Sequence, residues 1–167
     1  HVTGGVPADL SAQLLKDKSP HVRGWVVQLL VVPGGEPLSA EMLAQFAKMA
    51  EQDDSPVVRL DLASTLQRMP LEQRWPILSA LVAHGEDATD HNLPLMYWYA
   101  AEPLADVDPS RALRLALSAR EKMPQLVDFM VRRIGAGEPD KSLPVLVAGL
   151  ADAKDDALQL TYLRGLN

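Results

Sequence analysis

The 167-residue sequence has no cysteine, few aromatic residues and no long apolar run. Without cysteine the chain can form no disulfide, no thiolate nucleophile, no Cys-ligated zinc site and no covalently attached c-type haem. Aromatic residues make up only 5% of the sequence, whereas Leu, Ala and Val are abundant, and this balance favours helices packed on helices over a sheet. No apolar run approaches the ~18 residues that a membrane span needs, so we expect no direct membrane insertion.

Acidic residues outnumber basic ones by 22 to 16, which gives a formal net charge of −6 and an isoelectric point near 5.1. Nucleic acids and anionic membranes select basic surfaces, so this charge argues against either as a general partner. The sequence also has no Gly-x-Ser-x-Gly nucleophile elbow, no Gly-rich phosphate-binding loop and no His-Glu-x-x-His zinc motif. We therefore expect no enzymatic activity, no bound cofactor or metal, and no nucleic-acid partner.

Internal repeats are the most informative feature of the sequence. The stretches at residues 17–23 (DKSPHVR) and 53–59 (DDSPVVR) align without a gap, 36 residues apart. Counted from the proline, both copies place apolar residues at offsets 2, 6, 7 and 10, and so do three further copies that begin at Pro94, Pro124 and Asp156. These offsets fall on one face of a helix with 3.6 residues per turn, so each copy predicts an amphipathic α-helix.

The helix starts are marked by local signals. Ser19 and Ser55 are predicted to cap the first two repeat helices with their hydroxyls, and the prolines that follow suit the first helical position. Further amphipathic helices are predicted at about residues 8–16, 39–52, 72–84, 109–121 and 140–153. The sequence thus predicts an all-α fold, an α–α superhelix of about five antiparallel helix pairs. Pairs this short must stack on one another to bury their apolar faces, so we expect one repeat domain over residues 1–167.

The opening Asp-x-Ser-Pro-x-Val-Arg of the first two copies resembles the HEAT repeat. In that family, a loop aspartate and a helix arginine form a ladder between adjacent repeats. The resemblance implies these roles for Asp17 with Arg23 and for Asp53 with Arg59. The third, fourth and fifth copies carry Tyr97, Val127 and Gln159 in place of the arginine, so the ladder is expected to stop after two rungs.

A second resemblance covers most of residues 17–135. It rests on the segments at 66–70 (LQRMP), 74–76 (RWP), 84–88 (HGEDA), 92–100 (NLPLMYWYA) and 102–104 (EPL). These are similar to the HEAT segment of large bacterial envelope proteins known as membrane-bound dehydrogenases or c-type haem-binding proteins. Members join a propeller-like dehydrogenase domain, a HEAT segment and a cytochrome c module, and neither the propeller nor the haem motif is present here. The resemblance implies a piece of a larger multidomain protein, located in the periplasm or the cell envelope.

One candidate interaction surface is a row of aromatic residues. Trp25, Tyr99 and Phe129 share offset 5 in their copies and would line up along one side of the superhelix. Such a row can recognise a partner, because aromatic residues dominate binding hot spots. Its alternative use is packing between repeats.

A candidate polar site lies at residues 84–91, where two histidines and three carboxylates occur within eight residues. Imidazole and carboxylate together can hold a divalent ion such as zinc, although the spacing matches no known ligand motif. In the other interpretation, His84 lies in the last turn of a helix that Gly85 caps, and the acidic residues form a solvated loop.

The function that these observations predict is a non-catalytic HEAT scaffold or protein-interaction module of a larger bacterial envelope redox protein. Its partner would be a protein, either other domains of the parent chain or a separate molecule. The alternative is a module that contributes directly to the substrate or cofactor site of a membrane-bound dehydrogenase. Because the last copy keeps its apolar face at Leu158, Tyr162, Leu163 and Leu166, we also expect this end of the chain to be exposed and to mediate self-association.

Overall fold

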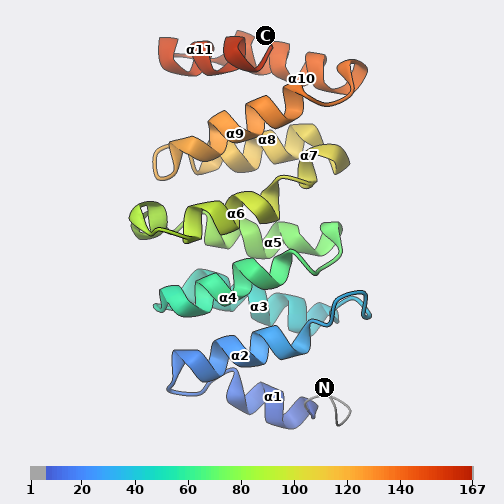
Figure 1. Ribbon diagram of the computed structural model, residues 1–167, viewed down its shortest axis with the longest axis vertical. Helices are drawn as coiled ribbons and strands as arrows, with labels where there is room; N and C mark the ends of the chain where they lie inside the picture. Colours follow the sequence, from blue (N-terminus) through green and yellow to red (C-terminus); the bar gives the residue numbers. More distant parts are fainter. Residues whose placement is uncertain (1–6, 167) are drawn as a thin grey trace. The chain divides into compact units, whose positions relative to one another are not determined.

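The computed structural model describes residues 7–166, and these residues are helical with no strand. The elements, shown in Figure 1, are α1 (Ala8–Leu14), α2 (Pro20–Leu30), α3 (Ala40–Gln52), α4 (Pro56–Leu66), α5 (Leu71–Leu81), the 3-10 helix η1 (Gly85–Thr89), α6 (Leu93–Ala101), α7 (Leu104–Val107), α8 (Pro109–Ser118), α9 (Pro124–Gly135), α10 (Pro139–Asp152) and α11 (Asp156–Gly165). The all-α prediction is confirmed. None of these helices is both long and apolar enough to cross a membrane.

Each predicted helix is found at its predicted place, with differences at some ends. The segment predicted at residues 72–84 ends at Leu81, and the separate short helix η1 begins at Gly85. Pro103 divides the third repeat helix into α6 and α7. Pro76 and Pro144 lie inside α5 and α10, which begin at least five residues earlier. The local sequence therefore predicts where helices form better than where they stop.

The predicted serine caps are wrong in their chemistry. Neither Ser19 nor Ser55 makes a side-chain cap hydrogen bond, although the prolines after them do begin α2 and α4. Instead, the Asp17 Oδ1 atom accepts a hydrogen bond of 2.8 Å from the Ser19 backbone N–H, and Asp53 Oδ1 accepts one of 3.0 Å from the Ser55 N–H. A carboxylate two residues earlier is the stronger acceptor, so the aspartates rather than the serines shape the two turns.

The chain divides into two compact units, residues 1–100 and 101–167. In the first unit α2 packs against α4, α3 packs against α5, and α4 contacts both α3 and α5. Helices α2 to α5 run in alternating directions (Figure 1). In the second unit α8 packs against α9, and α11 packs against both α9 and α10. The single repeat domain and its superhelix stay predictions.

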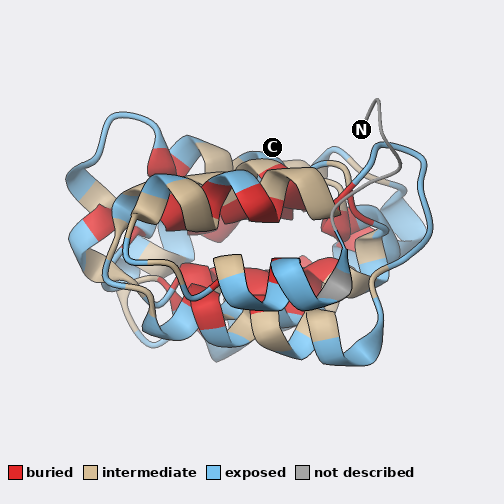
Figure 2. Ribbon diagram, turned by 90° about the horizontal axis from the view of Figure 1, so that it is seen from below, coloured by how far each residue is buried: buried red, intermediate tan, exposed pale blue. Residues whose placement is uncertain are grey.

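The repeated apolar offsets form the core of both units. In α4 they are Val58, Leu62, Ala63 and Leu66, and in α9 they are Leu126, Met130, Val131 and Ile134, all of them buried. Figure 2 shows buried residues on the inner sides of the helices and exposed residues on the outer sides. The fifth copy differs, because only Tyr162 is buried there, whereas the Leu163 side chain is 52% exposed. The apolar face of α11 is thus covered only in part, which agrees with the expectation that the last copy presents apolar side chains, and its self-association stays a prediction.

Two glycines allow α9 and α11 to cross closely. A Cβ atom built on Gly135 would lie 2.0 Å from the carbonyl oxygen of Gly165, and one built on Gly165 would lie 2.3 Å from the Val131 Cγ1 atom. Both distances are far below van der Waals contact, so a side chain at Gly135 would displace the backbone of α11, and one at Gly165 would displace the buried Val131 side chain.

Gly135→Ala should therefore destabilise the protein even though alanine is the better helix former. The helix-propensity gain of up to ~1 kcal/mol is outweighed by an overlap costing about 1–3 kcal/mol. The free energy of unfolding, measured by urea denaturation, should fall. Val147→Ala on the exposed side of α10, whose side chain is 54% exposed, serves as the control and should change little. Equal stability of Gly135→Ala and wild type would contradict the close crossing.

Candidate functional site

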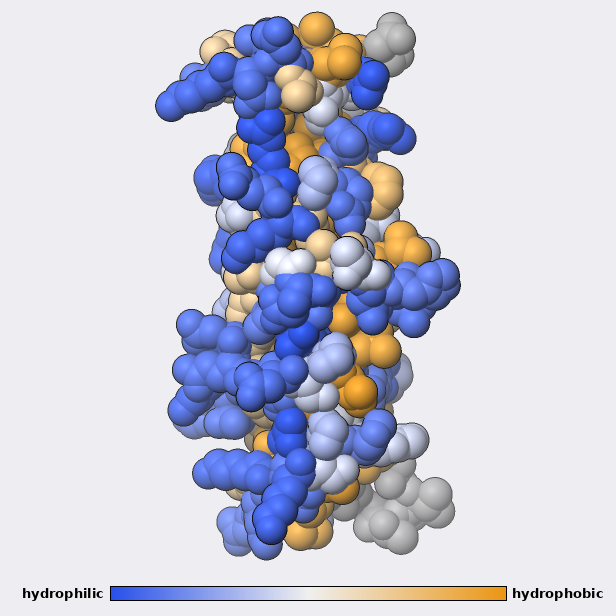
Figure 3. All heavy atoms as spheres, turned by 90° about the vertical axis from the view of Figure 1, so that its left-hand side faces the viewer, coloured by the Kyte–Doolittle hydropathy of each residue, from blue (hydrophilic) through white to orange (hydrophobic). Residues whose placement is uncertain are grey.

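The predicted ladder aspartates, Asp17 and Asp53, lie in the loops that lead into α2 and α4, and the arginines lie in the first turns of these helices. These two loops and the loop that leads into α6 lie on the face of the first unit shown in Figure 3, where hydrophilic side chains dominate. Beneath this surface a series of hydrogen-bonded arginine, aspartate and tyrosine residues connects these loops. We call this series the loop relay, and its members are Asp17, Arg23, Asp53, Arg59, Asp87 and Tyr97.

Arg23 forms the first step of the loop relay. Its Nε and Nη2 atoms donate to the two carboxylate oxygens of Asp53, each at 2.7 Å. Its Nη1 atom donates at 2.8 Å to the backbone carbonyl of Asp17, six residues earlier. The structure thus brings Arg23 and Asp53 together, whereas Asp17 contributes its carbonyl and not its carboxylate. One planar guanidinium spans two loops through three hydrogen bonds.

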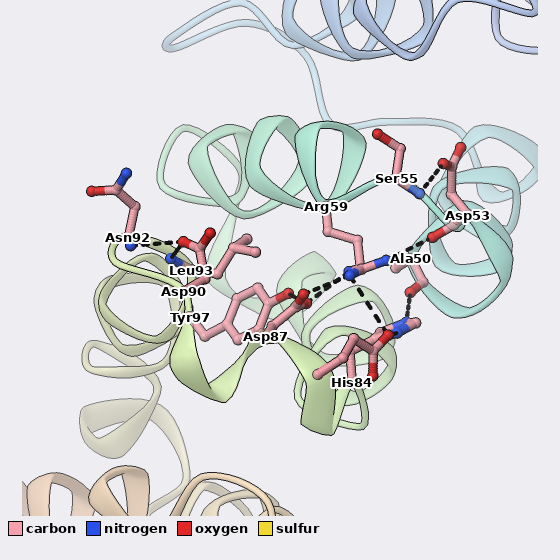
Figure 4. Close-up of polar contacts among 11 residues, drawn as sticks. Ala50, Asp53, Ser55, Arg59, His84, Asp87, Asp90, Asn92, Leu93 and Tyr97 are labelled. Carbon is pink, nitrogen blue, oxygen red and sulfur yellow. Dashed lines mark hydrogen bonds and ion pairs between the residues drawn. The ribbon is translucent and has the colours of Figure 1, made fainter.

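Arg59 repeats this geometry one copy later, in a buried setting. Its Nη1 atom donates at 2.9 Å to the Asp53 carbonyl, again six residues earlier. Its Nε and Nη2 atoms donate to the Asp87 carboxylate at 2.7 and 2.5 Å. Figure 4 shows Arg59 lying between Asp53 and Asp87. Both Arg59 and Asp87 are only 2% exposed, so this ion pair is almost fully removed from solvent.

Tyr97 closes the loop relay in place of a third arginine. It stands at the same offset from Pro94 as Arg59 does from Pro56, and its hydroxyl donates at 2.6 Å to Asp87 Oδ2 (Figure 4). Asp87 therefore accepts three hydrogen bonds from two side chains, which satisfies a buried carboxylate. Arg23 and Arg59 each reach the next loop, whereas Tyr97 binds a residue of the loop that precedes its own helix. The offset of Tyr97 is the signal that sequence reasoning could have used to find it.

In the third copy, two different aspartates make the two kinds of contact that Asp53 makes alone in the second copy. Asp53 both accepts the Arg23 guanidinium and turns the chain at Ser55. Asp87, in η1, accepts only side chains, whereas Asp90 turns the chain by accepting the backbone N–H groups of Asn92 and Leu93 at 2.8 and 2.9 Å. Sequence reasoning missed Asp87 because η1 places it four residues further from its proline than the repeat predicts.

The ionisation of these groups follows from their contacts. Hydrogen bonds to Asp87 raise the pKa of the Arg59 guanidinium above its ordinary value, against the opposing effect of burial. Burial, followed by the hydrogen bond to Asp87, raises the pKa of the Tyr97 phenol far above its ordinary value. Arg59 therefore stays a cation and Tyr97 a neutral donor over the whole physiological range.

The second unit contains a partial counterpart of the loop relay. Gln159, at the ladder offset of the fifth copy, donates at 3.2 Å to the carbonyl of Ala153, six residues earlier. The next carboxylate along, Asp155, caps α11 at the Leu158 N–H and binds both Nη atoms of Arg120, at 2.8 and 2.7 Å. Arg120 precedes its proline, so the repeat offsets do not predict it. At the ladder offset of the fourth copy, the Val127 side chain is buried in the core.

His84 takes part in hydrogen bonds that tie the loop to α3. Its Nε2 atom lies 2.7 Å from the Ala50 carbonyl oxygen, and its Nδ1 atom lies 2.7 Å from Glu86 Oε1. The same Glu86 oxygen is 3.6 Å from Arg59 Nη2. The Glu86 backbone N–H and the His84 ring lower the pKa of the Glu86 carboxyl. Within residues 7–166, no three histidine or carboxylate side chains are grouped so as to hold a metal ion.

The aromatic residues of the predicted row differ in exposure. Trp25 is 66% and Tyr99 51% exposed, whereas Phe129 is half-buried. In the second copy the same offset is occupied by Asp61, so the row is not aromatic throughout. Trp25 lines a cavity of about 520 Å³ together with residues of α2 and α4. It is the most exposed large apolar side chain of the described residues.

Comparison of the chain with protein-family models, with curated proteins and with solved structures gave no match. The resemblance to HEAT segments of haem-binding envelope proteins therefore stays a prediction.

Breaking the buried step of the loop relay should be costly. Arg59→Ala leaves the Asp87 carboxylate buried with Tyr97 as its remaining side-chain donor, and the free energy of unfolding should fall by about 3–5 kcal/mol. Lys141→Ala, which breaks the exposed Lys141–Glu138 pair, should cost no more than ~1 kcal/mol. Urea denaturation measures both. The double variant Arg59→Met with Asp87→Asn should lose less than Arg59→Ala, and equal costs for Arg59→Ala and Lys141→Ala would contradict the proposed burial penalty.

The Tyr97 phenol should make stability fall at high pH. In the unfolded chain a phenol ionises near pH 10, but its pKa is raised in the folded state, so only the unfolded state gains from deprotonation. Between about pH 10 and 11.5 this group should lower the unfolding free energy by about 1.4 kcal/mol per pH unit. In Tyr97→Phe this part of the slope should disappear. Tyr99→Phe, at an exposed position, should keep the wild-type slope, and an unchanged slope in Tyr97→Phe would refute the assignment.

Proposed function

We propose that this chain is a non-catalytic HEAT-type scaffold that binds another protein. The observation that carries the proposal is the loop relay, in which Arg23 and Arg59 each join two successive loops and Tyr97, at the same offset of the third copy, binds the carboxylate that Arg59 reaches. Polar side chains that often perform chemistry are here engaged in joining helices to one another.

The packing pattern supports the same function. Within each unit, helices contact the next helix of the chain or the next but one, as α2 with α4, α3 with α5 and α9 with α11 do. A stack in which each repeat contacts only its neighbours presents an extended surface whose residues are held in fixed positions. Exposed aromatic residues on such a surface, here Trp25 and Tyr99, are suited to bind a partner, because they bury a large area with little loss of conformational entropy.

Following the resemblance, we place the module in a larger bacterial protein of the periplasm or cell envelope. There it would hold a dehydrogenase-like domain and a haem domain in fixed relation, or dock a separate protein. The alternative function, a direct contribution to a substrate or cofactor site, predicts that the isolated chain binds haem or a quinone.

Site-specific photo-crosslinking tests the scaffold function. The photoreactive residue p-benzoylphenylalanine replaces Trp25, Tyr99 or Ser79, which is exposed on α5 and serves as the matched control. In extracts of the cells that make the protein, positions 25 and 99 should crosslink to the same protein, and an excess of unlabelled chain should suppress the product. Position 79 should not give it. Equal crosslinking at all three positions would refute the proposal, and binding of haem or ubiquinone by the chain in equilibrium dialysis would favour the alternative.

A further inference from the structure

The cavity beside Trp25 combines an exposed aromatic ring with a carboxylate. It has a volume of about 520 Å³, which is within the usual range of ligand sites, and lies where α2 and α4 pack together. Trp25, Gln28 and Val32 line it from α2 and the turn that follows, and Asp61 and Arg68 line it from α4 and the turn after that helix.

Asp61 is held against α2 by a close approach at Gly24. A Cβ atom built on Gly24 would lie 1.9 Å from Asp61 Oδ2, so only glycine leaves room for this carboxylate. Trp25 is the next residue in the chain, which places the carboxylate beside the residue that carries the indole. The partly buried carboxylate and the exposed ring therefore border the same cavity.

The Asp61 carboxylate has no cationic partner in the part of the chain that the structure describes. Gln28 Nε2 donates to its Oδ1 atom at 3.1 Å and to the Asp61 carbonyl at 3.2 Å. Arg68, in the turn after α4, is held elsewhere, because its Nη2 atom donates to Gln28 Oε1 and to Thr65 Oγ1. Burial raises the pKa of the Asp61 carboxyl, and the Gln28 hydrogen bond and His21 only partly offset this. An approaching cation would thus stabilise the charged form.

We infer that this cavity binds a lysine or arginine side chain of a partner protein, whose cation pairs with Asp61 and lies against the indole of Trp25. A cation on the face of a tryptophan is attracted by the π-system, and its aliphatic stem can pack on Val32. The charge of the unit is complementary to such a partner, because residues 1–100 hold twelve acidic and seven basic residues. This inference rests on the proposed scaffold function and specifies the chemistry of its partner.

Peptide titration followed by NMR tests the inference. The probes are three N-acetylated, C-amidated pentapeptides, Gly-Leu-X-Leu-Gly, in which X is Lys, Gln or Glu. The reporter is the indole N–H signal of Trp25, assigned through the loss of that signal in Trp25→Ala. The Lys peptide should shift this signal saturably, and the Gln and Glu peptides should bind at least about tenfold more weakly. High salt should weaken binding of the Lys peptide, because it screens the attraction between the cation and the carboxylate.

Variants separate the proposed contacts from general charge. Asp61→Asn keeps the shape of the side chain and the acceptor for Gln28, and it should lower the affinity for the Lys peptide about tenfold or more. Trp25→Ala should lower this affinity similarly, and its binding is followed through another assigned signal. The matched controls are Asp54→Asn, an exposed carboxylate, and Val147→Ala, an exposed apolar side chain outside the cavity, and both should bind as the wild type does. All variants should keep the wild-type circular dichroism spectrum.

Equal affinity for the Lys and Gln peptides, an unaffected Asp61→Asn variant, or no saturable shift with the Lys peptide would each overturn the inference. The scaffold proposal can fail or hold separately. Crosslinking of a partner at position 25 without binding of the Lys peptide would refute only the basic side chain as the recognised group. Binding of the Lys peptide without any specific crosslink would refute only the scaffold function.

Discussion

The structure depends on one arrangement of hydrogen bonds, in which an arginine joins its own loop to the next one. Three N–H groups of a single planar guanidinium reach a backbone carbonyl six residues earlier and a carboxylate about 30 residues later. Because the guanidinium is planar and rigid, its hydrogen bonds fix the two loops relative to each other. They thereby also fix how α2 packs on α4. The same carbonyl contact recurs at Arg59 and Gln159.

The ion pairs of the two units differ in burial, and therefore in how much stability is lost when one of them is broken. The side chains of Arg59 and Asp87 are each about 3% exposed, whereas those of Arg120 and Asp155 are 36% and 44% exposed. A buried pair has lost its hydration and must be fully hydrogen-bonded, which Tyr97 completes for Asp87. An exposed pair can break at little cost. The first unit thus contains a buried polar cluster whose disruption is costly, while the pair in the second unit is open to solvent.

One carboxylate outside the network has no ion-pair partner among the described residues. Asp53 and Asp87 are both paired with arginines, whereas the Asp61 carboxylate accepts a side-chain hydrogen bond from the amide of Gln28. Asp61 occupies the repeat offset at which Trp25 and Tyr99 are exposed, next to the apolar offset 6 that contributes to the core. Position within the repeat therefore determines which of these side chains pack between helices and which reach the surface.

The sequence by itself determined the helices, their buried offsets and the arginines of the first two copies. These depend on local properties, namely the 3.6-residue period and the fit of proline at the first helical position. Only the tertiary structure decided that Asp87 accepts from both Arg59 and Tyr97, that Arg120 reaches Asp155 and that Gly24 admits Asp61. Partners up to 37 residues apart meet only if the intervening helices and loops place them, and a short element such as η1 shifts that placement beyond what any repeat period can predict.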